Sequence, residues 1–140
     1  MCLIINDSIR KDKIKYIYKL FKLKNGKLYS FFRETKYKVG LNYPIGKHKP
    51  KNSKYFTAGG LHFYISIKRL SQVVFCHMLE SNKYDLLAIR LPLNKKDVIH
   101  YGSSNDVVLN KVKISRELYH RAVKGSNPNV VLSNDLKVYW

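Results

Sequence analysis

The feature that most constrains the fold is an Asn25-Gly26 dipeptide between two segments rich in aromatic and aliphatic residues. Asn-Gly is the dipeptide best suited to a two-residue type I′ turn, because both residues tolerate a positive φ. Residues 14–23 precede it and residues 27–32 follow it, and both segments have the composition of β-strands. The sequence therefore predicts an antiparallel hairpin here.

The rest of the chain predicts further strands and two short helices. Strands are expected over residues 61–65, 85–91, 97–101, 106–114, 129–132 and 136–140, the last two forming a closing hairpin. Apolar residues repeat at helical spacing after Ser66 and after Ser115, which predicts helices near 67–79 and 116–124. We therefore expect an α+β fold with a mainly antiparallel sheet of about seven strands.

We expect a single domain over residues 1–140, because the chain has enough apolar residues for one core and no linker. Residues 44–58 change character: prolines, glycines and lysines replace the apolar runs, and this stretch is predicted to be a flexible basic loop. The sequence contains no run of 18 apolar residues, so no transmembrane segment is expected. Two cysteines make no disulfide framework, so a soluble intracellular protein is expected.

The charge of the chain constrains its partners. Lys and Arg total 27 against 9 Asp and Glu, a net charge of +18 for which a polyanion such as nucleic acid is the natural complement. Lys outnumbers Arg 21 to 6, which favours diffuse, salt-sensitive contact over base-specific recognition. The 11 Asn, 11 Ile and 11 Tyr leave a second reading open, in which A+T-rich codons supply the lysines.

Cations and aromatic rings alternate along the predicted hairpin, which favours nucleic-acid binding there. Exposed rings stack on bases while lysines follow phosphates. The predicted contacts are Lys15, Lys19, Lys22, Lys24 and Lys27 of the hairpin, Lys47, Lys49, Lys51 and Lys54 of the loop, and Tyr16, Tyr18 and Tyr29 as stacking partners. The alternative is ordinary amphipathic patterning, with the rings buried and the lysines in water.

No motif in the sequence names a reaction. The histidines and cysteines lack the paired spacing of zinc ligands, and the nine acidic residues show no catalytic spacing. Cys76 and His77 are neighbours on a predicted helix, where adjacent side chains diverge, so we expect Cys76 to pack rather than react. The sequence thus favours a non-enzymatic protein without metal or cofactor.

One stretch resembles a known family. Tyr55-Phe56-Thr57-Ala58-Gly59-Gly60-Leu61-His62-Phe63-Tyr64-Ile65-Ser66, then a helix, a strand to Leu91 and Ile99-His100-Tyr101-Gly102 resemble the second half of the ADP-ribosyltransferase core of poly(ADP-ribose) polymerases. The resemblance implies a nucleotide pocket around Gly59, Gly60, His62 and Tyr64. No His-Gly-Thr stretch precedes it and no Glu stands where the catalytic carboxylate is expected, so it implies a diverged enzyme or a nucleotide-binding pseudoenzyme.

The whole chain is also similar in style to short uncharacterised proteins of large DNA viruses, phages and some bacteria. The resemblance rests on its Met-Cys-Leu start, on Tyr37-Lys38-Val39-Gly40 and on Gly60-Leu61-His62. It implies a viral origin, with the host cytoplasm or nucleus as the location. A third function follows from it, in which the basic surface docks an acidic host protein.

Overall fold

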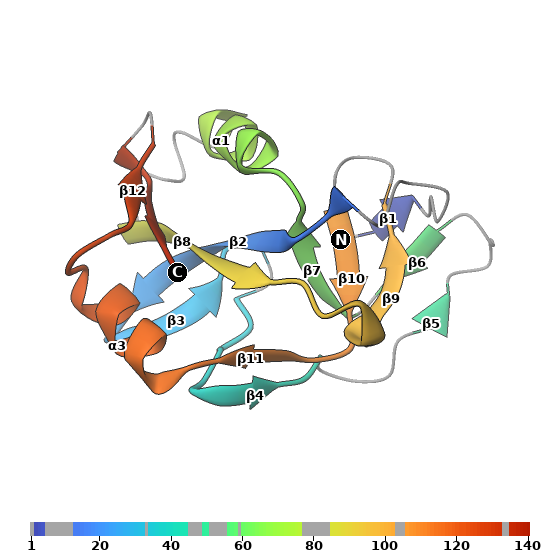
Figure 1. Ribbon diagram of the computed structural model, residues 1–140, viewed down its shortest axis with the longest axis horizontal. Coiled ribbons are helices and arrows are strands. Elements are labelled where there is room, and N and C mark those ends of the chain that lie inside the picture. The colour runs from blue at the N-terminus through green and yellow to red at the C-terminus, as the bar shows by residue number, and fades with distance from the viewer. Residues whose placement is uncertain are drawn as a thin grey trace.

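The computed structural model describes residues 2–4, 13–32, 34–44, 49–50, 56–58, 60–76, 85–102, 106–132 and 135–140 (Figure 1). The strands are β1 (Cys2–Ile4), β2 (Tyr16–Lys24), β3 (Lys27–Ser30), β4 (Gly40–Asn42), β5 (Lys49–Pro50), β6 (Phe56–Ala58), β7 (Leu61–Tyr64), β8 (Asp85–Pro92), β9 (Val98–Tyr101), β10 (Asp106–Leu109), β11 (Val112–Ile114), β12 (Val130–Val131) and β13 (Lys137–Tyr139). The helices are α1 (Ile67–Cys76), α3 (Arg116–Lys124) and a 3₁₀ turn, η2 (Lys95–Asp97).

An eight-stranded sheet organises the chain, in the order β12-β13-β8-β2-β7-β10-β9, with β3 also paired to β2. Every pairing in it is antiparallel except that of β13 with β8. The predicted α+β class with a mainly antiparallel sheet is therefore confirmed, with eight strands in this sheet rather than about seven.

The predicted hairpins are both present. β2 and β3 pair antiparallel around Asn25 and Gly26, whose φ angles of 51° and 72° are those that a type I′ turn requires. At the other end of the chain, β12 pairs antiparallel with β13. The turn chemistry of the sequence therefore located the first hairpin correctly.

Both predicted helices are present, and both begin after a serine. The Ser115 hydroxyl accepts a hydrogen bond from the Leu118 amide at 3.2 Å, and Ser66 does the same for Arg69 at 3.4 Å. α3 ends at Gly125, which has a left-handed φ of 67°. α1 is described as far as Cys76, and the end predicted near residue 79 lies outside the described residues.

Two predictions about strands need correction. The strand expected over residues 106–114 is two strands, because Asn110 turns away and donates its amide to the Asp97 carbonyl at 2.9 Å. β11 then leaves the large sheet and pairs with β4. The basic stretch near 44–58, predicted as a loop, contributes β5 and β6, which form a three-stranded sheet with β1; residues 45–48 and 51–55 lie outside the described residues.

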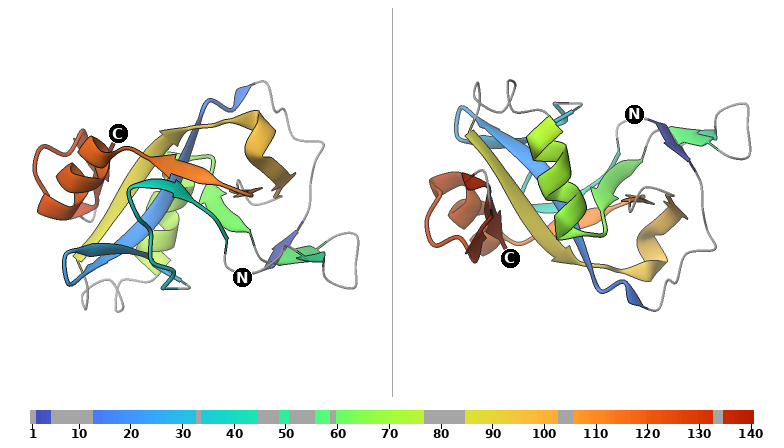
Figure 2. Two further views of the ribbon diagram at one scale, coloured as in Figure 1. Left: turned by 90° about the horizontal axis from the view of Figure 1, so that it is seen from below. Right: turned by 90° about the horizontal axis from the view of Figure 1, so that it is seen from above.

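The large sheet has a hydrophobic core on each face. α1 lies on one face, and α3, β11 and β4 lie on the other (Figure 2). Leu70, Val73 and Val74 of α1 pack with Leu20 and Ala88 in one core. The second core, on the α3 face, contains Leu118 and Ala122 of α3 together with Ile17, Phe21, Leu87, Ile89, Ile114 and Tyr139. Because alternate residues of β2 and β8 enter different cores, both strands are buried on two faces over most of their length.

Candidate nucleic-acid interface

A row of aromatic and charged residues crosses five strands on the α1 face of the large sheet. In the strand register Tyr18 is paired with Arg90 of β8 and with Tyr64 of β7, and Tyr64 is paired with Asp106 of β10. Paired residues point to the same face of a sheet. At the other end of the row, Trp140 follows β13, which runs parallel to β8. We call these five residues, together with Tyr16 two positions before Tyr18 on β2, the transverse row.

The Arg90 side chain is held between two aromatic rings. Its guanidinium carbon lies 4.0 Å from the ring centroid of Tyr16 and 3.9 Å from that of Trp140. A guanidinium at this distance over an aromatic face forms a cation–π contact, and the planar group of Arg suits such stacking better than the ammonium of Lys. Tyr16 and Trp140 remain 41% and 38% exposed. The stack therefore places two partly exposed rings on either side of one fixed positive charge.

The backbone of Trp140 is fixed by hydrogen bonds to two other elements. Its amide donates to the Asn129 side-chain oxygen at 2.8 Å, and its carbonyl accepts from Arg121 of α3 at 2.8 Å. Arg121 also donates to the same Asn129 oxygen at 2.7 Å. Trp140 is thereby held in place before any ligand arrives, which lowers the entropy cost of binding on its ring.

The core beneath α1 is contacted by Tyr18 and Tyr64 of the transverse row, whereas Tyr16 and Trp140 of the Arg90 stack lie outside it. Leu70, Val73 and Val74 pack over the middle of β2 and β8, whereas Tyr16 lies at the start of β2. The first turn of α1 adds two cations near the row, an exposed Lys68 and a half-buried Arg69. None of the acidic residues is in this first turn. The open half of the α1 face therefore combines exposed rings with positive charge.

The charge of Arg69 also affects the pKa of Tyr64. Burial raises the pKa of the Tyr64 hydroxyl above its usual value, and the Arg69 charge opposes that rise. Asp106 adds a smaller upward contribution to the Tyr64 pKa. Tyr64 is therefore a neutral hydrogen-bond donor at physiological pH, with an arginine beside it.

Two of the predicted hairpin contacts, Lys22 and Lys24, are engaged within the protein. Lys22 is only 6% exposed and donates to a carboxylate oxygen of Glu34 at 2.6 Å, while Lys24 lies 3.5 Å from the other oxygen. Hydrogen bonding and charge from Lys22, and then the charge of Lys24, lower the pKa of Glu34. The Lys24 ammonium also lies 5.7 Å from the centroid of the Tyr29 ring. Both lysines are therefore paired with Glu34, Lys22 in a buried position and Lys24 with its side chain still 37% exposed.

A third predicted contact, Lys19, stands at a fork in the sheet. β7 pairs with β2 at Tyr18, and β3 pairs with the same edge of β2 from Phe21 onward. Between them Lys19 donates to the backbone carbonyl of His62 at 2.6 Å, and its ammonium lies 5.1 Å from the centroid of the Phe63 ring. Lys19 therefore links β2 to β7 beside the fork.

A small cleft of about 60 Å³ lies at this fork and includes part of the pocket expected from the ADP-ribosyltransferase resemblance. Gly60, His62 and Tyr64, all from the β7 region, line it with Lys19 and Asp106. Gly60 has a φ of +71°, and a Cβ there would collide with Val108, so only glycine fits. Pockets for whole cofactors run to roughly 300–1,000 Å³. The cleft is of a size for a few atoms of a ligand.

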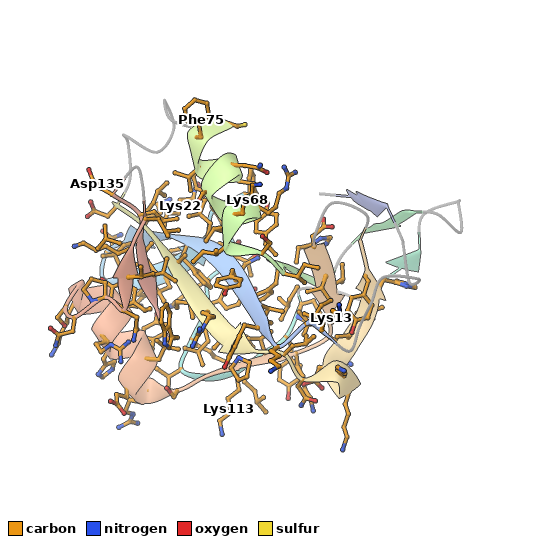
Figure 3. All side chains as sticks on the ribbon, turned by 45° about the horizontal axis from the view of Figure 1, so that its top comes forward. Lys13, Lys22, Lys68, Phe75, Lys113 and Asp135 are labelled. Atoms are coloured by element: carbon orange, nitrogen blue, oxygen red, sulfur yellow. The ribbon has the colours of Figure 1, made fainter. Side chains whose placement is uncertain are left out.

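The remaining predicted contacts are dispersed. Lys15 and Lys27 are exposed, and Tyr29 is half-buried on β3. Lys49 is described only as part of the β5 backbone, and Lys47, Lys51, Lys54 and Gly59 lie outside the described residues. In Figure 3 the labelled Lys68 and Lys113 lie on opposite sides of the protein. The labelled cations therefore do not gather on one face, and the exposed aromatic rings distinguish the transverse row from the rest of the surface.

Sequence reasoning missed Arg90, Arg69 and Trp140. Arg90 is the one charge within the apolar run of residues 86–91, and Trp140 is the single tryptophan of the chain. A lone arginine in an otherwise buried strand was the available signal, because burying such a charge requires a partner. The rings that partner it lie on two other strands, and the sequence does not reveal that pairing.

Several other features bear on function. Cys76 is exposed at the end of α1, so the expectation that it packs is wrong. Among the described residues, no group of three or more His, Cys, Asp or Glu side chains is placed to hold a metal ion. Neither helix in the described part of the chain combines the length and apolarity needed to cross a bilayer.

Comparison with known proteins adds no relative. No protein-family model matches the chain, and searches of curated proteins and of solved structures also find no match.

Proposed function

We propose that this protein binds single-stranded nucleic acid, without strong sequence preference, on the open half of the α1 face. The Arg90 stack carries the proposal, since it leaves Tyr16 and Trp140 partly exposed beside a fixed positive charge. Unpaired bases stack on aromatic side chains whatever their identity, because every base has a π-face. Bases within a duplex are already stacked and have no face to offer.

The charge of the chain supports a nucleic-acid partner and the weak sequence preference. Lys68, Arg69 and Lys15 supply cations near the row, and the net charge of +18 attracts any polyanion at long range. Lysines contact phosphates without reading bases. The affinity should therefore fall steeply as the salt concentration rises. For single strands, a tenfold rise in salt lowers the logarithm of the binding constant by about 0.7 for each neutralised phosphate.

Trp140 supplies the test, because it is the only tryptophan and lies within the proposed surface. Titration with a mixed-sequence single-stranded oligonucleotide at low salt should quench its fluorescence in a saturable way. An equal concentration of the same sequence as a blunt duplex should quench it much less. Anisotropy of the labelled oligonucleotides measures both affinities independently of the tryptophan.

Two outcomes would overturn the proposal. If neither oligonucleotide binds at low salt, the row is not a nucleic-acid surface. If the duplex binds as tightly as the single strand and leaves Trp140 fluorescence unchanged, the charge alone accounts for binding. Capture of an acidic protein that resists nuclease but not salt would then favour the protein-docking alternative.

A further inference from the structure

A second and larger cavity lies at the other end of the sheet, away from the transverse row. It has a volume of about 500 Å³ and is bounded by the end of β2, the starts of β8 and β13 and the end of α3. These elements meet at the left of Figure 1, and Figure 3 labels Asp135 at this end of the protein. We call it the α3–β13 cavity. Its volume lies within the range of roughly 300–1,000 Å³ typical of small-molecule sites.

A buried hydroxyl without a hydrogen-bond partner lies in the wall of this cavity. Tyr139 is 0% exposed, and its hydroxyl has no partner among the described residues. Buried polar groups are nearly always hydrogen-bonded, because leaving one unpaired costs free energy. Burial also raises the pKa of Tyr139, partly offset by the charge of Arg121, so the hydroxyl is protonated at neutral pH. The wall of the cavity therefore holds a donor that lacks an acceptor, and a ligand reaches it by displacing the side chains that cover it.

A positive charge lies close to that donor. Lys137 is two residues earlier on β13, so its side chain leaves the same face of the strand. Its ammonium and the Tyr139 hydroxyl lie 3.8 Å and 3.9 Å from the point that a Cβ on Gly125 would occupy. Lys124, the last residue of α3, also lines the cavity. Two lysines and a free hydroxyl donor form the pattern of groups that binds an oxyanion.

The remaining walls differ in chemistry from this cationic corner. Asp85 and Asp135 line the cavity, and neither forms an ion pair with a described lysine. Leu86, Leu136 and Val123 supply apolar wall between the charged groups. Carboxylates accept hydrogen bonds from sugar hydroxyls, as they do in many nucleotide sites. The cavity thus presents an anion site, hydroxyl acceptors and an apolar surface.

We infer that the α3–β13 cavity binds a nucleoside monophosphate. The phosphate accepts hydrogen bonds from Tyr139, Lys137 and Lys124, the ribose hydroxyls donate to Asp85 or Asp135, and the base rests on the apolar wall. A free amino acid would satisfy the charges but fill little of the volume. This site is separate from the transverse row, and binding in it does not depend on binding of single strands.

The test is a titration of the isotope-labelled protein with the four common nucleoside monophosphates, followed by NMR. Saturable shifts at Gly125, Lys137 and Tyr139 are expected, with inorganic phosphate and the uncharged nucleosides binding at least about tenfold more weakly, because each makes only part of the contacts. Tyr139→Phe removes one hydroxyl and keeps the shape, and it should weaken binding about tenfold, as the loss of a hydrogen bond to a charged group does. Lys137→Gln should weaken binding by a similar factor.

Matched controls separate this inference from the proposed function. Lys113→Gln removes an exposed lysine on β11 and should leave monophosphate binding unchanged, as should Trp140→Ala in the row. Circular dichroism of each variant checks folding. Three results would overturn the inference. They are no saturation by any monophosphate, equal affinity for inorganic phosphate, which would mean an adventitious ion only, or shifts confined to Tyr16 and Trp140 with none in the cavity.

Discussion

Both halves of β2 combine aromatic rings with lysines, but they differ in what they offer to a partner. In the first half, Tyr16 and Tyr18 lie on the α1 face with Arg90 alongside, and Tyr16 lies outside the core beneath the helix. In the second half, Lys22 and Lys24 lie on the same face and are paired with Glu34. The elements that cover each half make the difference.

This contrast explains why a basic segment need not be a binding surface. A charged side chain under a neighbouring element must find a partner, because an unpaired buried charge is costly. Lys22 satisfies that requirement with Glu34 and so loses its availability to phosphates. Arg90 satisfies it with two rings and keeps those rings partly exposed. The partner that a cation within the sheet takes therefore decides whether its surroundings can bind a ligand.

The largest expected effect is a loss of stability when a side chain is removed from the core that α1 covers. Leu70→Ala removes a fully buried side chain of α1, and the free energy of unfolding should fall by about 2–5 kcal/mol. Phe75→Ala on the same helix removes a ring that is 66% exposed and should change stability by less than about 0.5 kcal/mol. Urea denaturation of both variants makes the comparison. Equal effects would mean that α1 does not form the core of its face.

The next largest effect is on single-strand binding by the open half of the α1 face. Trp140→Ala and Tyr16→Ala should each weaken single-strand binding by about 1–3 kcal/mol, as the loss of a stacking ring does elsewhere. Tyr43→Ala is the matched control, because Tyr43 is 58% exposed and follows β4 on the α3 side of the sheet. Anisotropy at one fixed salt concentration measures all three. A loss for Tyr43→Ala as large as for the row variants would break the comparison.

The sequence predicted the local parts of this fold and missed the long-range ones. Asn25-Gly26 located the first hairpin because the turn chemistry lies within two residues, and Ser66 and Ser115 located both helices for the same reason. The division of the strand near Asn110 depends on a hydrogen bond to Asp97, which no local pattern reveals. The sequence identified the hairpin rings as candidate contacts. It did not predict the Arg90 stack, because the stack joins residues from three strands whose order in the sheet no local pattern reveals.

A smaller effect tests whether the stack needs an arginine or only a charge. Arg90→Lys keeps the positive charge but replaces the planar group that lies between Tyr16 and Trp140. We expect single-strand affinity to fall about fivefold, corresponding to about 1 kcal/mol for the lost cation–π contacts. The dependence on salt should be unchanged, because the number of charges is the same. A fall in the salt slope with unchanged low-salt affinity would instead assign Arg90 to a phosphate.

The smallest expected effect is on stability and depends on pH. It concerns the second half of β2, where Lys22 and Lys24 are paired with Glu34. Lys22 and Lys24 lower the pKa of Glu34 below its ordinary value of 4.5, so their contribution to stability is present above that value. It is lost as the pH falls below 4.5 and through the lower pKa of the folded state. Glu34→Gln should therefore be slightly less stable than the parent protein at pH 7, and the difference in the urea midpoint should disappear in acid.

The same variant should bind single strands at least as tightly as the parent, because it releases two lysines. Weaker binding by Glu34→Gln would mean that the two halves of β2 act as one surface.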